Sequence, residues 1–305
     1  MIYTVTLNPS IDCFMELPEL VEGATNRATE QRMIPGGKGI NVSRVLHRFG
    51  IASTLLGFTA GFTGAFLKEE LAAEGLRTHF TDTPGMTRIN MKLKTAKETE
   101  VNGPSQAISE EHVHQLLAGL DSAEEHDLLV LSGSLPPSLP SETYRMIAEK
   151  LTLRTVIDTS GVPLQKALSA RPYLIKPNID ELTALYGQES ADTPGAVRLA
   201  KKAVADGAKN VLVSRGAESA LLVSAERVLE AAVPTGTIHS TVGAGDSMVA
   251  GFLAGLENGL APEEAFRWSI AAGSATAFSE SLCTKEHVED LLPSVSVHEY
   301  KEESV

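Results

Sequence analysis

Apolar and polar positions along this 305-residue chain form short, continuous apolar runs separated by longer stretches with helical spacing. Runs rich in Val, Ile and Leu, apolar at nearly every position, are typical of strands in a parallel sheet buried on both faces. The stretches between them place apolar residues three or four positions apart, as amphipathic helices do. This order predicts an α/β fold, with a mainly parallel central sheet between two layers of helices. The predicted strands are Tyr3–Leu7, Ser53–Phe58, Leu128–Leu131, Thr155–Ile157, Tyr173–Ile175 and Asn210–Val213. The predicted helices are Ile40–Phe49, Thr63–Glu74, Glu110–Leu120, Ser141–Lys150, Asp180–Tyr186, Pro194–Asp206 and Pro262–Ser279.

Two segments, Cys13–Met33 and Thr87–Val101, break this order because they alternate like strands without a helix between them. We expect them to pair as a small antiparallel sheet that projects from the core as a lid, formed by about residues 12–33 and 87–102. The whole chain, 1–305, is then a single domain. From Gly251 onward the pattern is mainly helical, and the polar tail Ser294–Val305 is expected to fray.

Composition and charge exclude several classes of function. The formal net charge of −13 disfavours nucleic acid and anionic lipid as partners, so any phosphate ligand must be held by local cations. The only two cysteines, Cys13 and Cys283, lie far apart in the sequence, which favours a cytoplasmic protein over a disulfide-stapled secreted one. The uncharged run Phe49–Leu67 is long enough to raise the question of a membrane span. Its four glycines favour a strand, a loop and a helix start instead.

The most informative motif is Thr241–Phe252, Thr-Val-Gly-Ala-Gly-Asp-Ser-Met-Val-Ala-Gly-Phe. Gly243, Ala244 and Gly245 are small, so their amides can approach a ligand closely, and a helix is predicted to begin at Asp246. Amides at a helix start favour a bound anion, as phosphoryl transfer requires. Asp246 would then accept the proton of the attacking hydroxyl. The segment alone is equally compatible with a tight turn before a helix that Asp246 caps.

A second glycine-rich segment, Pro35–Arg44, also precedes an apolar-periodic helix. Gly36 and Gly37 offer main-chain groups to sugar hydroxyls, and Lys38 offers a charge to a phosphate. Asn41, one turn into the helix, supplies a donor and an acceptor that suit a polyol. The segment lacks the Walker A spacing, and no Gly-x-Gly-x-x-Gly dinucleotide fingerprint occurs in the chain. A simple turn before a helix would also explain it.

Together, in this order and separation, the two segments resemble the signature regions of the PfkB carbohydrate kinases, which belong to the ribokinase-like superfamily. The resemblance runs from Thr4 to about Ser281. Within the family, Thr6–Asp12 (Thr-Leu-Asn-Pro-Ser-Ile-Asp) resembles the branch that acts on phosphorylated sugars. The resemblance implies a ribokinase-like three-layer α/β/α sandwich with a β-sheet lid. It also implies transfer of a phosphoryl group from ATP, with Mg²⁺, to a sugar phosphate.

The resemblance further implies which residues meet each substrate. For the sugar phosphate they are Asp12, Arg27, Gly37, Lys38, Asn41, Arg88, Ser132 and Gly133. For ATP they are Lys176, Asn178, Ser214 and Gly216, with Glu181 organising Mg²⁺ through water. Asp246 matches the catalytic base, and Gly243, Ala244 and Gly245 match the anion hole.

Several of these residues have simpler interpretations. Asn178 and Glu181 have the spacing of a capping box, which satisfies amides at a helix start without any metal. Arg27 and Arg88 would otherwise be solvated cations on the lid strands, and Asp12 would be a turn residue.

The expected acceptor is the free primary hydroxyl of fructose 1-phosphate, which yields fructose 1,6-bisphosphate. Tagatose 6-phosphate and fructose 6-phosphate remain open, because the sequence does not fix which end of the sugar the arginines hold. A sugar-phosphate sensor without catalysis is the alternative from another class, and Asp246 argues against it. Ser219 stands where relatives usually have a second glycine. Serine suits this position of the expected ATP-binding turn unless a positive φ is required there. Pairing of two lids in a homodimer is the expected assembly.

Overall fold

The computed structural model describes residues 1–151, 153–189 and 192–301, and its largest element is a ten-stranded sheet. Its strands are β1 (Ile2–Thr6), β4 (Ser53–Thr59), β5 (Arg77–Asp82), β8 (Leu128–Ser132), β9 (Arg154–Asp158), β10 (Leu174–Ile175), β11 (Asn210–Ser214), β12 (Ser219–Ser224), β13 (Val228–Ala232) and β14 (Val297–Glu299). They lie in the order β14-β13-β12-β11-β10-β9-β8-β1-β4-β5. The strands from β11 to β5 are parallel, whereas β12, β13 and β14 add antiparallel pairs at one edge.

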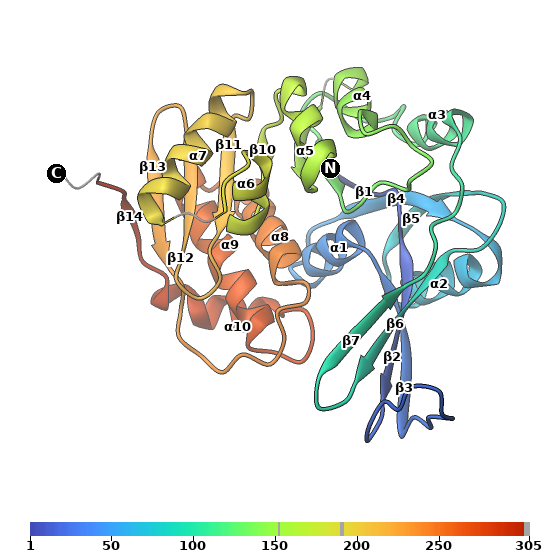
Figure 1. Ribbon diagram of the computed structural model, residues 1–305. Coiled ribbons are helices and arrows are strands. Elements are labelled where there is room, and N and C mark those ends of the chain that lie inside the picture. The colour runs from blue at the N-terminus through green and yellow to red at the C-terminus, as the bar shows by residue number, and fades with distance from the viewer. Residues whose placement is uncertain (152, 190–191, 302–305) are drawn as a thin grey trace.

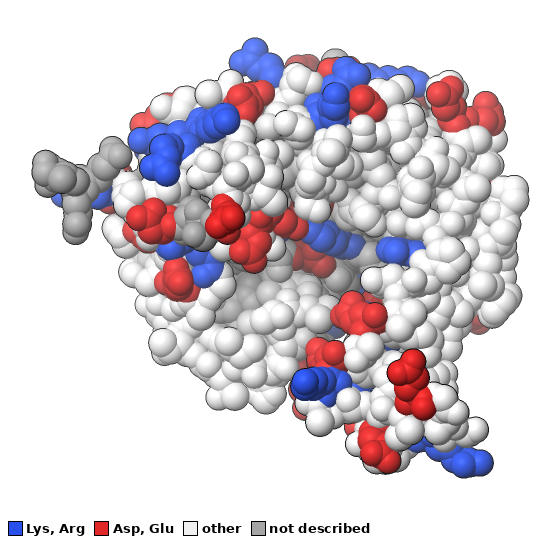
Figure 2. Space-filling view, viewed as in Figure 1, with Lys and Arg blue, Asp and Glu red and all other residues white. Residues whose placement is uncertain are grey.

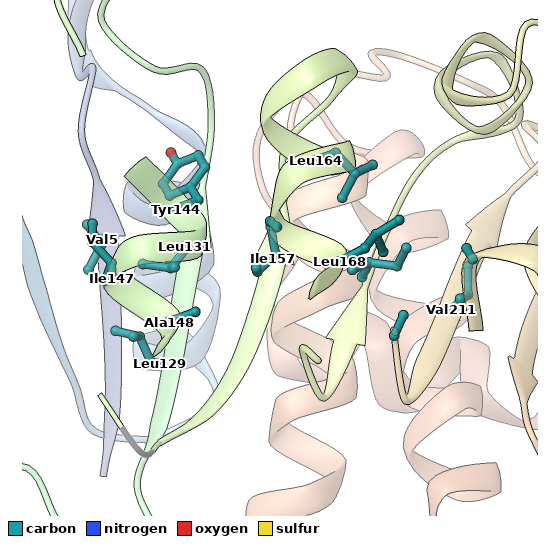
Figure 3. Packing of buried hydrophobic residues seen from close by; sticks show 14 of the residues in the cluster. Val5, Leu129, Leu131, Tyr144, Ile147, Ala148, Ile157, Leu164, Leu168 and Val211 are labelled. Carbon is teal, nitrogen blue, oxygen red and sulfur yellow. The ribbon is translucent and has the colours of Figure 1, made fainter. Parts of the chain in front are cut away.

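Helices cover both faces of this sheet, so the predicted three-layer sandwich is confirmed (Figure 1). They are α1 (Lys38–Arg48), α2 (Gly61–Ala73), α3 (Glu110–Ala118), α4 (Thr143–Lys150), α5 (Gly161–Ala167), α6 (Ile179–Leu185), α7 (Thr193–Ala205), α8 (Ala244–Glu257), α9 (Pro262–Ala277) and α10 (Lys285–Leu291), with short 3₁₀ turns at Leu168–Ala170 and Leu292–Ser294. One buried cluster joins the sheet to α3–α7, and a second joins it to α1, α8, α9 and α10. Figure 3 shows part of the first, where Tyr144 and Ile147 of α4 lie near Val5 and Leu131.

The central strands are buried on both faces because their side chains alternate between these two clusters. In β1, Ile2 belongs to one cluster, whereas Tyr3 and Val5 belong to the other. The last residues of several strands are polar but still buried, among them Thr6, Ser132 and Asp158. Since carboxyl ends of parallel strands meet at one edge, these polar side chains gather there.

A second sheet projects from the main body, next to α2 (Figure 1). Its strands are β2 (Ser10–Glu16), β3 (Glu30–Gly36), β6 (Arg88–Lys94) and β7 (Glu98–Asn102), in the order β3-β2-β6-β7. The β2–β3 and β6–β7 pairs are antiparallel, but the central β2–β6 pair is parallel. The prediction of a purely antiparallel sheet was therefore wrong. Each segment forms a hairpin, and the two hairpins meet through strands that run in the same direction.

Several strands escaped the sequence analysis. β5 is polar at most positions (Arg-Thr-His-Phe-Thr-Asp), because it is the last strand of the sheet and is only partly buried. β12 and β13 form an apolar hairpin after β11 that the search for alternating strands and helices passed over. The tail was expected to fray from Ser294 onward, but Val297–Glu299 pairs with β13. Residues 302–305 of that tail lie outside the described residues.

Within residues 1–151, 153–189 and 192–301, no helix combines the length and apolar character needed to cross a membrane. The uncharged run Phe49–Leu67 is divided between the end of α1, strand β4 and the first half of α2.

Candidate active site

The predicted site residues meet where the carboxyl ends of the parallel strands face the small sheet. Figure 2 shows this face hollowed between the main body and the projecting sheet, with acidic and basic side chains close together in the hollow. Open α/β sheets bind ligands at this edge because loops and helix starts converge there.

Asp246 lies in the first turn of α8, whose N-cap is Gly243 in the left-handed region at φ 78°. That backbone angle favours glycine, and an added Cβ there would also lie 2.5 Å from Leu282 Cδ2. The amide of Ala244 donates to the carbonyl of Thr241 at 3.2 Å, so the turn itself uses this group. Among the described residues, the amides of Gly243, Gly245 and Asp246 have no protein acceptor. The start of α8 therefore presents free N–H groups beside a buried carboxylate.

Helix α1 and the ends of β9 and β10 place polar and charged side chains close to Asp246. Asn41 of α1 donates from Nδ2 to Asp246 Oδ2 at 2.8 Å. Lys38, at the start of α1, donates to Asp158 Oδ1 at 3.0 Å. Lys176, which follows β10, lies 3.6 Å from the same oxygen. The ends of β9 and β10 and the starts of α1 and α8 thus bring two carboxylates and two ammonium groups into one cluster.

This cluster shifts two pKa values. Burial and the charge of Asp158 raise the pKa of Asp246 to about 6, although the Asn41 hydrogen bond and the two lysines oppose the rise. Burial lowers the pKa of Lys38, but Asp158, Asp246 and Glu181 outweigh it and raise the pKa to about 12. At neutral pH Asp246 is therefore a carboxylate that binds a proton more readily than an ordinary aspartate. A base of this kind suits proton abstraction near pH 7.

Lys176 also lies against the α8 turn. A Cβ added at Gly245 would lie 3.1 Å from its Nζ, so a side chain there would require this ammonium group to shift by a few tenths of an ångström. The side chain is buried and has only Asp158 as an ion-pair partner within the described residues. An anion at the start of α8 would meet both the amides and this cation.

The residues predicted to meet the sugar form the opposite wall. Asp12 of β2 accepts hydrogen bonds from Ser10 Oγ at 2.9 Å and from Asn90 Nδ2 at 3.1 Å. Its carboxylate occupies the space over Gly36, where a Cβ would lie 2.5 Å from Oδ2. Arg88, at the start of β6, donates to the carbonyl of Asn8 at 3.0 Å. Hence Asp12 and Arg88 are fixed components of the sheet junction rather than solvated surface residues.

The remaining predicted sugar residues, Gly37, Ser132 and Gly133, lie at the same edge. Gly37 is the N-cap of α1 at φ 146°. Ser132 ends β8, and the amide of Gly133 donates to the carbonyl of Asp158 at 2.9 Å. Arg27 is different, because it lies exposed in the long loop between β2 and β3. Within this chain the structure does not bring Arg27 together with the other site residues.

Buried polar atoms without partners gather at this edge. Within the described residues, such atoms are Thr6 Oγ1, Arg88 Nε, Gln106 Nε2 and Oε1, Ser132 Oγ, Asp158 Oδ2, Arg215 Nε and Ser269 Oγ. Buried polar groups in proteins nearly always have a hydrogen-bond partner. Apart from Ser269 in α9, these residues lie at strand ends, at the start of β6 or in the loops beside them. Unpartnered groups at this edge are what a polar ligand would satisfy.

The predicted ATP residues lie at the ends of β10 and β11. Asn178 and Glu181 form a complete capping box at the start of α6, as the simpler interpretation of this motif required. Ser214 ends β11 and forms a bridge with Asn178, and Gly216 has φ 61° in the turn that follows. Ser219 does not have a positive φ and begins β12, so serine is compatible with the turn at that position.

No three metal-ligating side chains come together anywhere in the described part of the chain. Mg²⁺ is commonly held by one or two carboxylates together with water and substrate phosphates, rather than by an all-protein cage. Asp158, with one buried oxygen unpartnered, and Glu181 supply donors of that kind.

Asp158 is the main residue that the sequence analysis missed. It contacts Lys38 and Lys176 and raises the pKa of Asp246. A signal was present, because this aspartate directly follows the apolar strand predicted at Thr155–Ile157. A charged residue at the carboxyl end of a buried parallel strand is a site candidate in any doubly wound fold.

The fold and this cluster define a class: a phosphotransferase of α/β architecture, with a buried carboxylate beside free amides at a helix start. The comparison with known families agrees, since residues 5–288 match the pfkB family of carbohydrate kinases. The chain belongs to this family.

Relatives and solved structures resemble the chain over nearly its whole length. A 1-phosphofructokinase of Bacillus subtilis is 49% identical over 300 residues, which cover 97% of this chain and 99% of the relative. A D-tagatose-1-phosphate kinase of Bacillus licheniformis is 37% identical, with 92% and 94% covered. A crystal structure of phosphofructokinase-2 from Escherichia coli has a TM-score of 0.90 and 33% identity, with 96% and 98% covered.

Proposed function

We propose that this protein is a 1-phosphofructokinase, which transfers the γ-phosphoryl group of ATP to fructose 1-phosphate and yields fructose 1,6-bisphosphate and ADP. The observation that carries the proposal is Asp246, a buried carboxylate beside free amides at the start of α8. Asn41 orients it, and burial and Asp158 raise its pKa to about 6.

In the proposed reaction, Asp246 accepts the proton of the sugar's free primary hydroxyl as that oxygen attacks the γ-phosphorus. The new P–O bond forms while the bond to the β–γ bridging oxygen breaks, and its electron pair leaves with ADP. The amides of Gly243, Gly245 and Asp246 and the ammonium group of Lys176 stabilise the charge on the transferred group. Lys38 offsets the charge between the two carboxylates, so that a phosphate can approach them.

The ATP molecule is proposed to lie along the ends of β10 and β11, with Ser214 and Gly216 beneath it. Mg²⁺ would be held by the ATP phosphates, with Asp158 and Glu181 as carboxylate partners directly or through water. When bound, the metal offsets negative charge on the phosphates. The capping bonds of Glu181 use one carboxylate oxygen, Oε2, and leave the other for this role.

Two relatives named for sugars phosphorylated at C1 favour fructose 1-phosphate over a 6-phosphate as the acceptor. The layout of the site requires only that the sugar's phosphate lie away from the attacked hydroxyl, near Arg88, which a 1-phosphate and a 6-phosphate both satisfy. D-Tagatose 1-phosphate is the competing acceptor, because it carries its phosphate at the same end.

The small sheet is proposed to act as a lid and to pair with that of a second copy. One face carries Asp12 and Asn90 toward the site. The strand register places Met15, Met91, Leu93 and Val101 on the other face, where they are partly or fully exposed. An exposed apolar face of this kind suits a symmetric homodimer. We also propose a cytoplasmic location, because Cys13 and Cys283 are free thiols.

A coupled ADP-release assay against a panel of sugar phosphates tests the proposal. The panel contains fructose 1-phosphate, tagatose 1-phosphate, fructose 6-phosphate, tagatose 6-phosphate and unphosphorylated fructose. We expect the highest kcat/KM with fructose 1-phosphate. If none of these compounds releases ADP above the rate with ATP alone, the kinase proposal fails. A preference for a 6-phosphate would overturn the choice of sugar but not the class of reaction.

A further inference from the structure

Gln106 lies in the segment that leaves β7 and runs along the main body to α3 (Figure 1). We propose that its side-chain amide recognises the substrate, donating from Nε2 to a phosphate oxygen of the sugar phosphate. The inference rests on the proposed function and adds to it a residue that determines specificity.

The state of this side chain motivates the proposal. Gln106 is only 9% exposed, and both Nε2 and Oε1 are buried without a hydrogen-bond partner in the described part of the chain. An unpartnered buried amide group destabilises the fold, so proteins rarely keep one without a use. A polar ligand that enters the site would satisfy both atoms at once.

The anchors of the segment place it between two walls of the sugar site. On one side, the amide of Gly103 donates to the carbonyl of Ile89 at 3.1 Å and approaches Asn90 Oδ1 at 3.3 Å. Asn90 is the residue that holds Asp12. On the other side, the amide of Ile108 donates to Ser138 Oγ at 2.8 Å, in the loop that follows Gly133. Gln106 is therefore held between the sheet junction and the end of β8.

The neighbouring unpartnered groups favour a phosphate rather than a neutral ligand. Arg88 Nε and Ser132 Oγ belong to these same two walls and are also buried without partners. The Arg88 guanidinium brings a positive charge, and its Nη2 donates to the carbonyl of Asn8. The loop that follows Gly133 is also joined to the segment after β1, because Asn8 Nδ2 donates to Ser134 Oγ at 3.1 Å.

Charge decides which end of the sugar lies here. The opposite end, at Asp246 and the free amides of α8, is proposed to receive the attacked hydroxyl and the γ-phosphate of ATP, whose charge would repel a second phosphate there. The phosphate therefore faces Arg88 and Gln106. With Nε2 donating to a phosphate oxygen, Oε1 is left to accept a bond from a neighbouring sugar hydroxyl.

The test is steady-state kinetics of Gln106→Met and Gln106→Glu. Methionine keeps the length but removes both hydrogen bonds, and glutamate replaces the donor with a negative charge. We expect KM for fructose 1-phosphate to rise on the order of 10- to 100-fold with methionine, and further with glutamate, because bonds to a charged group are lost. KM for ATP should stay within about 2-fold of wild type, since ATP is proposed to lie elsewhere. Selectivity for fructose 1-phosphate over fructose should fall in both variants.

The control is Gln115→Met, because Gln115 is an exposed glutamine of α3 whose side chain bonds to Glu111 and to no other described residue. Its kinetics should match wild type. If the Gln106 variants keep the wild-type KM for fructose 1-phosphate while the wild type is active, the amide serves only the fold and this inference is overturned. Thermal melting separates loss of fold from loss of binding, and Gln106→Asn, which keeps the amide, should recover part of the affinity. A wild type inactive on every sugar phosphate would instead overturn the proposed function.

Discussion

At the residue scale, the chemistry of this protein depends on how one carboxylate is surrounded. Asp246 is buried and close to Asp158, yet it is kept ionisable near neutral pH by Asn41, Lys38 and Lys176. A change in the groups around Asp246 would alter its pKa. That pKa affects both the proton transfer and the free energy of unfolding.

Asp246→Asn should fold and bind both substrates but turn over at least about 100-fold more slowly, since loss of a general base typically lowers the rate 10²- to 10⁴-fold. Asparagine preserves an oxygen to accept the Asn41 bond. The measurements are kcat in the ADP-release assay and substrate affinity by calorimetry. Turnover close to wild type would contradict the role of this residue.

The pH dependence follows from the same group. Because the folded pKa of Asp246 is about 6, kcat/KM should rise tenfold per pH unit below pH 6 and level off above it. The folded-state pKa of Asp246 exceeds the ordinary aspartate pKa of 3.8, so the folded protein binds this proton more tightly than the unfolded chain. The contribution of Asp246 to stability is therefore lost as the pH rises from about 4 to 6. Asp246→Asn should gain stability relative to wild type over that interval, measured by denaturant unfolding at pH 4.5 and 8. An equal difference at both pH values would contradict the pKa shift.

At the scale of elements, the site is assembled from helix starts and strand ends. α1 and α8 both begin at a glycine with positive φ, at Gly37 and Gly243, and both point their first turns into the same edge of the sheet. Gly245 has no side chain at the start of α8, and the Lys176 ammonium group lies close to where its Cβ would be.

Gly245→Ala tests this close approach. Alanine favours a helix over glycine by about 1 kcal/mol, so the variant should melt no lower than wild type. The new methyl group should displace the Lys176 ammonium group from the α8 amides, and kcat should fall about 10-fold or more. Unchanged kcat would show that the amine does not act at the α8 turn.

At the scale of the whole molecule, the small sheet projects from the three-layer sandwich (Figure 1), and in the proposed function the sandwich holds ATP while this sheet covers the sugar phosphate. In the described part of the chain, no helix packs on the outer part of that sheet's apolar face, which consists of Met15, Met91, Leu93 and Val101. We expect it to meet a second copy.

Replacing both Leu93 and Val101 with glutamate should convert a dimer into a monomer in sedimentation velocity. Each copy would bring two charges into the symmetric interface, so the dimer would have to bury four. The control is Met146→Glu, since Met146 is 53% exposed on α4, away from the small sheet. A monomeric wild type at micromolar concentration would contradict pairing through this face.

The sequence by itself determined the layered fold, most of the helices and the two glycine-rich helix starts. These depend on local periodicity and on residue types such as glycine, which one segment carries without help from others. It also identified Asp246, because a carboxylate directly after Gly-Ala-Gly is a local motif. The sequence did not predict the polar edge strand β5 or the short strand β14. Their stability comes from pairing with β4 and β13 rather than from their own apolar pattern.

Only the tertiary structure decided which distant residues act together. Asp158 is joined to Lys38 across 120 positions, and Asn41 to Asp246 across 205. Gln106 belongs to no sequence motif, and only the fold shows that its amide is buried without a partner among the described residues, in a segment anchored at Gly103 and Ile108. The parallel pairing of β2 with β6, which sets Asp12 beside Asn90, likewise depends on how two separate hairpins meet. Periodicity constrains neighbours within one turn or one strand, whereas the burial and charge that shift a pKa come from the whole fold.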